Sequence, residues 1–354
     1  MVCAKKSAAS LAAAATTVYQ SYSPSATGAP GATGASPAGL NSTNNLAATT
    51  STATVSAANS GIKGFNYGAF FLDYSAKVEA DFEYEFQRAQ DLTGTSGWSS
   101  ARLYTMVQYG TTSDPIQAIP AAIATNTSLL LGMWVSGSTS AITNEIAALK
   151  AAITKYGTDF TDLVQGISVG SEDLYRAAQG DASEPGVEVD TLIDYISQVR
   201  TAIAGTALSS IPVGHVDTYD SFENATNTKI ISDIDWIGFD GYPYWESTNG
   251  NSIEDASDLF FTGLNKTNNI AQGKPVWVTE TGWPAVGDDQ GEAVASAANA
   301  RTYWKEVTCA LVSSNINLWY YDLQESQNGQ ASPDFGIFPA GDLMTVEERW
   351  DLSC

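Results

Sequence analysis

Two glutamates stand where a predicted buried strand gives way to a loop. Glu172 ends the run GISVGSE and is followed by a helix-like segment, whereas Glu280 ends VWVTE just before a break at Thr281–Pro284. Two carboxylates about 5–5.5 Å apart across a cleft suit glycoside hydrolysis, because one protonates the leaving oxygen and the other attacks the oxocarbenium-like centre. Either glutamate alone is explained equally well as a structural ion-pair partner, so the interpretation depends on the pair.

Aromatic residues are dense around the other predicted strand ends. They are Tyr67, Tyr104, Trp134, Tyr175, Tyr219, Tyr242, Tyr244, Trp245, Trp283, Trp319 and Tyr320. Aromatic faces stack on sugars and line concave sites, although buried strands also favour these residues for packing. The stretch Tyr242–Trp245 is the strongest candidate for a sugar platform, because Pro243 places it beyond the strand.

Polar residues also mark the strand ends: Asn66, Arg102, Asp217, Asp240 and Gln324. Arg102 or a tyrosine hydroxyl is expected to keep the Glu280 carboxylate ionised. We interpret His215, the only histidine, as a hydrogen-bonded barrel residue and not as a catalytic group. The chain has no G-x-S-x-G or H-E-x-x-H motif, and we expect neither a metal nor a cofactor.

Eight apolar or β-branched runs alternate with helix-like segments after residue 61. The predicted strands are Ile62–Phe70, Ala101–Met106, Ser128–Val135, Val164–Val169, Ile211–Val216, Trp236–Phe239, Pro275–Thr279 and Ile316–Tyr321, and the helix-like stretches include Lys77–Leu92, Ile142–Tyr156, Val189–Ile203 and Ala293–Leu311. This rhythm predicts an α/β fold, a (β/α)₈ TIM barrel whose active site lies at the carboxyl ends of the strands. A doubly wound sheet is the alternative, but the first predicted strand is not followed by a glycine-rich phosphate turn.

The first 60 residues differ from the rest in composition. They are rich in Ser, Thr, Ala and Gly and nearly lack aromatic and branched aliphatic residues. Such a segment buries too little apolar area to offset its ordering entropy, so we expect residues 1–60 to form a disordered arm. Residues 61–354 then form the catalytic domain, and the start of the arm resembles a signal peptide only weakly.

Charge and cysteine content point to a secreted protein. Acidic residues number 39 against 16 basic ones, a formal net charge of −23, which argues against nucleic acid or an anionic membrane as partner. No apolar run is long enough for a transmembrane span. We also expect the protein to be a monomer. Four sequons, at Asn41, Asn126, Asn224 and Asn265, favour the secretory route and an extracellular glycoprotein. In an oxidising compartment Cys309 and Cys354 are expected to pair, which leaves Cys3 over.

Several ordered motifs make the sequence recognisable. The stretches GISVGSEDLYR (166–176) and VWVTETGWP (276–284) resemble the acid/base and nucleophile motifs of glycoside hydrolase family 17, and within it the fungal cell-wall endo-β-1,3-glucanases. KGFNYG (63–68), SARLYTM (100–106), GHVDT (214–218), WIGFDGYPY (236–244) and DFGI (334–337) support the match. The resemblance spans residues 61–354 in order, which makes it far more specific than either glutamate motif alone.

The resemblance implies a retaining endo-β-1,3-glucanase that acts on cell-wall glucan. It gives Glu172 the acid/base role and Glu280 the nucleophile role. Plant members usually carry Asn where Ser171 stands, so the hydrogen bond to the sugar 2-OH has no assigned donor here, and no lipid-anchor signal is predicted. The expected substrate-binding residues are Tyr67, Arg102, Tyr104, Ser171, Tyr175, Asp217, Asp240, Tyr242, Tyr244, Trp283 and Gln324. A β-1,3-glucanosyltransferase and a non-catalytic glucan-binding wall protein remain the alternatives.

Overall fold

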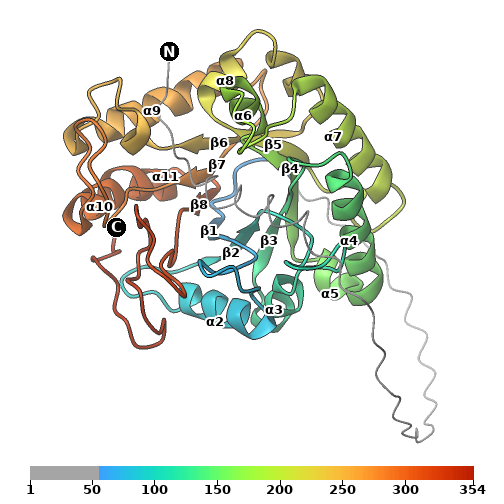
Figure 1. Ribbon diagram of the computed structural model, residues 1–354, viewed down its shortest axis with the longest axis horizontal. Helices are drawn as coiled ribbons and strands as arrows, with labels where there is room; N and C mark the ends of the chain where they lie inside the picture. Colours follow the sequence, from blue (N-terminus) through green and yellow to red (C-terminus); the bar gives the residue numbers. More distant parts are fainter. Residues whose placement is uncertain (1–55) are drawn as a thin grey trace, which may run out of the picture.

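Eight parallel strands close into a barrel in the computed structural model, which describes residues 56–354 (Figure 1). The strands are β1 (Lys63–Tyr67), β2 (Trp98–Leu103), β3 (Ser128–Met133), β4 (Val164–Ser171), β5 (Val213–Asp217), β6 (Trp236–Gly241), β7 (Val276–Thr281) and β8 (Leu318–Tyr320). Each strand pairs with its neighbour in sequence, and β8 pairs back to β1. The predicted (β/α)₈ barrel is therefore confirmed, and the open-sheet alternative is wrong.

Helices connect the strands and surround the barrel (Figure 1). They are α2 (Glu79–Gln90), α3 (Ala118–Thr125), α4 (Ala141–Tyr156), α5 (Thr158–Thr161), α6 (Asp173–Gln179), α7 (Val189–Ile203), α8 (Tyr219–Glu223), α9 (Ile253–Ile270), α10 (Ala297–Tyr303) and α11 (Cys309–Ser313), with the short η1 (Thr228–Ser232), η2 (Pro243–Trp245) and η3 (Trp304–Thr308). Parallel strands need such crossovers, because the chain must return to the same end of the sheet before the next strand.

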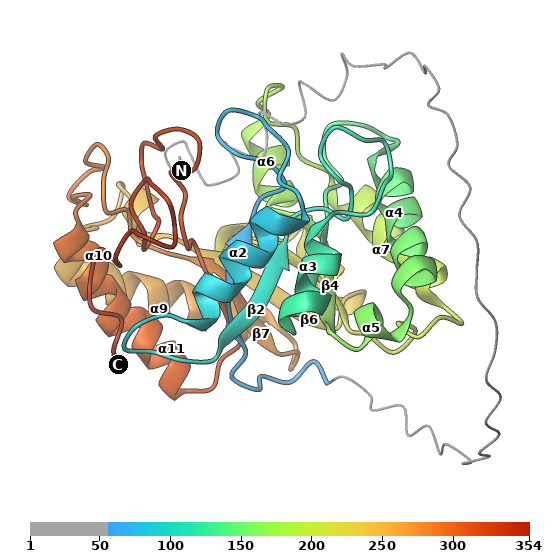
Figure 2. The same ribbon diagram turned by 90° about the horizontal axis from the view of Figure 1, so that it is seen from below.

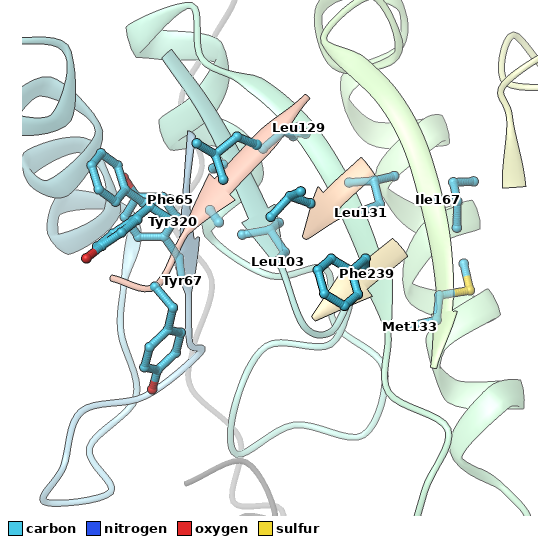
Figure 3. Packing of buried hydrophobic residues seen from close by; sticks show 14 of the residues in the cluster. Phe65, Tyr67, Leu103, Leu129, Leu131, Met133, Ile167, Phe239 and Tyr320 are labelled. Atoms are coloured by element: carbon cyan, nitrogen blue, oxygen red, sulfur yellow. The ribbon is translucent and has the colours of Figure 1, made fainter. Parts of the chain in front are cut away.

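One continuous apolar core fills the layer between the strands and the helices. Figure 3 shows side chains from successive strands meeting in this core, with Phe65 of β1 beside Tyr320 of β8. Their ring centroids are 6.4 Å apart in an edge-to-face arrangement. Because most strand residues are buried on both faces, the strands read as apolar runs in the sequence.

Tryptophans fill the barrel interior near the amino ends of the strands. Trp236 and Trp277 stack with centroids 4.1 Å apart, and Trp319 lies 5.8 Å from Trp277. Neighbouring glycines make room for the indoles: a Cβ at Gly214 would lie 2.4 Å from the Trp236 ring, and one at Gly64 would lie 2.8 Å from Trp319. The interior is thus a packed core, and the open end of the barrel is at the other side.

The segment before β1 closes this tryptophan-filled end of the barrel. The Trp277 indole donates to the Ala57 carbonyl at 2.9 Å, and the Asn59 amide donates to the Val276 carbonyl at 3.1 Å. Ser60 N–H donates to Asn317 Oδ1 at 2.8 Å. Barrel contacts therefore begin at Ala57, inside the range 1–60 that was expected to form an arm. The expected disorder of the arm, Cys3 and the sequon at Asn41 lie outside the described residues.

The segment after β8 packs back on α2 and is linked to the last helix. Arg88 of α2 pairs with Glu348 at 3.2 Å and donates to the Leu343 carbonyl at 3.2 Å. A disulfide joins Cys309 at the start of α11 to Cys354. The C-terminal tail is therefore held at both α2 and α11.

Candidate active site

Glu280 lies near the carboxyl end of β7 and is surrounded by hydrogen-bond donors. Its side chain is buried, and Oε1 accepts from Arg102 Nη1 at 2.6 Å and from the Tyr104 hydroxyl at 2.7 Å. Oε2 accepts from the Tyr242 hydroxyl at 2.8 Å. Three donors, one of them cationic, are therefore directed at this buried side chain, an arrangement that stabilises negative charge on a carboxylate.

Arg102 of β2 is fixed by partners on two other strands. Nη1 also donates to Asn66 Oδ1 at 2.6 Å, and Nη2 donates to Ser171 Oγ at 3.0 Å. Burial acts to lower the pKa of Arg102, but the adjacent Glu280 carboxylate raises it above its ordinary value. Burial and Glu280 also raise the pKa of Tyr104, so this tyrosine remains a protonated donor. Ser171 thus serves the guanidinium as an acceptor.

Tyr242, just beyond β6, follows the same logic. Burial, and then the Glu280 charge, raise the pKa of its hydroxyl well above the ordinary value. Its ring packs edge-to-face on Tyr321 and on Phe335, with centroids 6.2 and 5.6 Å away. The ring position is therefore set by packing, and the hydroxyl is aimed at Glu280.

Glu172 is the first residue after β4 and has a left-handed backbone conformation, with φ of 53°. Its N–H donates to the Val216 carbonyl of β5 at 2.8 Å, and its side chain is 4% exposed. A non-glycine residue pays strain in this conformation, which persists only where the surroundings enforce it. The turn directs Glu172 into the pocket at the mouth of the barrel, at the N-terminus of α6.

Asp173 braces this turn. Its Oδ2 accepts from Ser171 N–H at 2.9 Å, and its Oδ1 accepts from the Ser136 hydroxyl and lies 3.4 Å from Arg176 Nη2. The side chain is fully buried. Sequence reasoning did not single out Asp173; the only signal was a second acidic residue directly after the strand-end glutamate.

A pocket opens beside Glu172. Its lining comes from the ends of β4, β5 and β6 and the loops after them: Glu172, Tyr175, Thr218, Tyr219, Asp220, Asp240, Gly241, Tyr242, Trp245 and Glu246. Tyr242 lines the pocket with Glu172 and also donates a hydrogen bond to Glu280. Burial raises the pKa of Asp240 well above its ordinary value, and the charges of Glu280 and Glu172 raise it further.

The structure brings some of the predicted substrate-binding residues together. Arg102, Tyr104 and Tyr242 contact Glu280 directly, whereas Tyr175 and Asp240 line the pocket. Sequence reasoning missed Thr218, Asp220 and Glu246 as pocket residues. Thr218 and Asp220 lie at the start of α8, and Glu246 follows η2, so all three come after strand ends, where the sequence gives no side-chain direction.

Other predicted residues make contacts elsewhere. Tyr67 packs edge-to-face on Phe86 of α2 at 4.9 Å. The Trp283 indole donates to the Val294 carbonyl at 3.0 Å, and the Tyr244 hydroxyl donates to the Asp288 carbonyl. The Gln324 amide donates to the carbonyls of Pro339 at 2.5 Å and Gly341 at 3.1 Å. In this structure these four side chains hold loops and core together.

His215 and Asp217 of β5 form a fully buried pair. His215 Nε2 and Asp217 Oδ2 are 3.1 Å apart, and His215 Nδ1 contacts the Val169 carbonyl at 2.8 Å. Asp217 also accepts from Leu174 N–H and Thr218 N–H, each at 2.9 Å. His215 thus has the hydrogen-bonded barrel position that was expected for it, and Asp217 ties β5 to α6.

Surface and metal-binding features can be read for residues 56–354. The sequon asparagines Asn126, Asn224 and Asn265 are all exposed. Within this range no group of His, Cys, Asp and Glu side chains is arranged to hold a metal ion. None of its helices combines the length and apolar character that crossing a bilayer requires.

Fold and site together define a glycoside hydrolase of the (β/α)₈ type. The chain belongs to the BtgE/BtgC glycoside hydrolase domain family, whose sequence model matches residues 64–336. This match, with the relatives below, confirms the resemblance to glycoside hydrolase family 17.

Curated fungal proteins are similar over most of the chain. A protein of Aspergillus oryzae named probable glucan endo-1,3-beta-glucosidase eglC is 53% identical over 312 residues, which is 87% of this chain and 66% of the relative. Its Aspergillus niger counterpart is 52% identical over 85% of this chain and 65% of its own length. The chain thus spans about two thirds of the length of these curated relatives. Among solved structures, a family 17 β-1,3-glucanosyltransferase from Rhizomucor miehei has a TM-score of 0.63 and 25% identity, covering 82% of this chain and all of that one.

Proposed function

We propose that this chain hydrolyses internal β-1,3 linkages of glucan by a retaining mechanism, with Glu280 as nucleophile and Glu172 as acid/base. The observation that carries the proposal is the environment of Glu280, whose two oxygens accept from Arg102, Tyr104 and Tyr242. A carboxylate so stabilised is ready to attack an anomeric carbon and form a covalent glycosyl-enzyme.

Glu172 has the complementary environment. It is buried and borders the pocket. A buried carboxyl group favours the protonated form, which the first step needs in order to protonate the departing glycosidic oxygen. The same group, then ionised, activates the water that releases the sugar from Glu280.

Glucan as substrate is supported by the names of the relatives and by the lining of the pocket. The Aspergillus proteins are named probable glucan endo-1,3-beta-glucosidases. Tyr175, Tyr219, Tyr242 and Trp245 offer aromatic faces to a sugar chain. We further propose an extracellular or cell-wall location, which fits the glucan named for the Aspergillus relatives and the exposed sequons, and a monomer.

The test is cleavage of laminarin by the wild-type chain and by Glu280→Gln, Glu172→Gln and the control Glu188→Gln, whose site is exposed at the start of α7. Both active-site variants should lose at least about a thousandfold in kcat, and the control should not. An aryl β-laminaribioside whose phenol leaves without protonation should still react with Glu172→Gln in the first step but not with Glu280→Gln. Near-normal turnover by Glu280→Gln would show that the nucleophile is misassigned.

Glucanosyl transfer is the second candidate. It is favoured by the Rhizomucor miehei structure, which is described as a β-1,3-glucanosyltransferase and is 25% identical to this chain. Transfer uses the same carboxylates, but a second glucan instead of water resolves the intermediate. Product sizing on laminaripentaose decides between them, since products longer than the substrate indicate transfer. Glucan binding without any released reducing ends would instead favour a non-catalytic wall protein.

A further inference from the structure

Asp240 is a third buried carboxyl group, beside Glu280 in the sheet and in the lining of the pocket that Glu172 borders. It lies on β6 directly beside Glu280 of β7, with their Cα atoms paired in the sheet register. Its side chain is 3% exposed and borders the pocket together with Glu172. The proposed catalytic mechanism uses only Glu172 and Glu280, so it explains neither the protonation state of Asp240 nor its function.

The hydrogen bonds of Asp240 are incomplete for an ionised carboxylate. Oδ1 accepts from the Thr279 hydroxyl at 2.7 Å, but the buried Oδ2 has no partner among residues 56–354. Asp217 on the next strand is a contrast, because both of its oxygens accept backbone N–H groups and one also contacts His215. A buried ionised oxygen without a donor is costly, whereas a protonated oxygen can donate to a ligand.

The charges around Asp240 point the same way. Glu280 faces it from β7 and Glu172 from the end of β4, while Arg102 on β2 is the cation that acts on it. That guanidinium is already bound to Glu280 Oε1 at 2.6 Å. Two other titratable groups, Tyr104 and Tyr242, lie near Glu280 and have raised pKa values, so both are neutral. On the neighbouring strand β5, Asp217 and His215 pair with each other. Because the only cation near Asp240 among the described residues is already paired with Glu280, a charge on Asp240 would have no cation of its own, so Asp240 keeps a proton in addition to Glu172.

We propose that Asp240 is a neutral carboxylic acid in the free enzyme and donates a hydrogen bond through Oδ2 to a hydroxyl group of the glucosyl unit bound between Glu172 and Glu280. This inference rests on the proposed function. Asp240 then recognises a sugar hydroxyl as a neutral donor, while Glu280 acts as the ionised nucleophile and Glu172 as the acid/base. Burial, and then the Glu280 charge, raise the pKa of Asp240 well above its ordinary value, which agrees with this state.

The central comparison is Asp240→Asn with Asp240→Leu. Asparagine is neutral, its oxygen accepts from Thr279 and its amide donates where Oδ2 stood; leucine has a similar shape but no donor. We expect kcat/KM on laminaripentaose to be at least about tenfold higher for Asp240→Asn than for Asp240→Leu, the discrimination that a lost neutral hydrogen bond gives. Equal losses in the two variants would overturn the proposal. Asp217→Asn is the matched control. Its amide NH₂ would replace an oxygen that accepts a backbone N–H, so this variant should have a lower melting temperature than wild type. Asp240→Asn should leave the melting temperature unchanged.

The pH–rate profile separates a neutral from an ionised Asp240 and needs no leucine variant. If Asp240 is neutral, Asp240→Asn removes no charge, so both limbs of the profile should stay within about 0.3 pH unit of wild type. If Asp240 is ionised, the variant removes a negative charge beside both glutamates, and both limbs should move about one pH unit or more to lower pH. Such a move would refute the neutral state.

Binding distinguishes failure of this inference from failure of the proposed function. In the Glu280→Gln background, calorimetry with laminaritriose should show Kd about tenfold weaker for the added Asp240→Leu than for the added Asp240→Asn. Equal affinities overturn the donor role of Asp240. Inability of the wild-type chain to cleave laminarin would instead overturn the proposed function, whatever the binding of these variants.

Discussion

Tyr242→Phe tests how Glu280 is held. The Tyr242 hydroxyl is the one donor found for Glu280 Oε2 among residues 56–354, whereas Oε1 receives both Arg102 and Tyr104. The substitution keeps the ring against Tyr321 and Phe335 and removes only the hydroxyl. One oxygen of the proposed nucleophile then loses its donor while the pocket keeps its shape.

The size of the effect follows from the kind of hydrogen bond. A bond to a charged partner contributes about 1.5–3 kcal/mol, and about 1.36 kcal/mol corresponds to tenfold in rate, so kcat should fall about 10–150-fold. Tyr104→Phe should cost less, because Arg102 still donates to Oε1. KM should change little in Tyr242→Phe, since the ring that faces the pocket remains.

Initial rates on laminaripentaose for Tyr242→Phe, Tyr104→Phe and Tyr303→Phe measure this order. Tyr303 is the control, a buried tyrosine whose hydroxyl pairs with Thr281 Oγ1 at 2.7 Å, one residue from Glu280 but not on its carboxylate. Thermal unfolding should show all three variants folded. A loss for Tyr303→Phe as large as for Tyr242→Phe, or a larger loss for Tyr104→Phe, would refute the reasoning.

Two further predictions concern stability. Burial raises the pKa of Glu145, which accepts from Thr105 Oγ1 at 2.5 Å and Met106 N–H at 2.6 Å, to about 8. The folded state therefore binds a proton that the unfolded state releases, so this contribution is present at low pH and is lost as the pH rises toward 8. Chemical denaturation at pH 5 and pH 8 should show that the free energy of unfolding of the wild type falls by a few kcal/mol between the two pH values, the order that the linkage relation gives. The fall should be smaller in Glu145→Gln. Identical falls in the two proteins would contradict the assignment. Replacing Cys309 and Cys354 by serine opens a loop of sequence separation 45. By the chain-entropy relation, the free energy of unfolding should fall by about 4 kcal/mol. An unchanged midpoint of denaturant unfolding would contradict this prediction.

The barrel was predictable from sequence because its strands are buried on both faces. All eight predicted strands overlap observed ones, and Val189–Ile203 matches α7 at both ends. Boundaries were harder to place. The second predicted strand, Ala101–Met106, extends beyond β2, which ends at Leu103. Tyr104 therefore lies just past the strand, and its hydroxyl binds Glu280.

Site residues were predictable only where a strand fixes their direction. Arg102 lies on β2, near the strand end where the sequence placed it, and its guanidinium binds Glu280 of β7. Tyr244 and Trp283 belong to the same aromatic-rich stretches as Tyr242 and yet pack into loops, since side-chain direction beyond a strand end depends on tertiary contacts. The Glu145 brace on α4 gave no sequence signal, because an acidic residue in a helix is usually solvated.

The tryptophan-filled end of the barrel has a practical meaning for anyone handling this protein. The chain enters β1 across that end, through Ala57 and Asn59, while α6 lies at the opposite end (Figure 2). The pocket is at that opposite end, because Glu172 and Tyr175 at α6 line it. A partner joined directly to residue 56 therefore emerges at the end of the barrel away from the pocket. An affinity tag, a solid support or a carbohydrate-binding module joined at that residue leaves the mouth of the barrel free to bind an insoluble polymer.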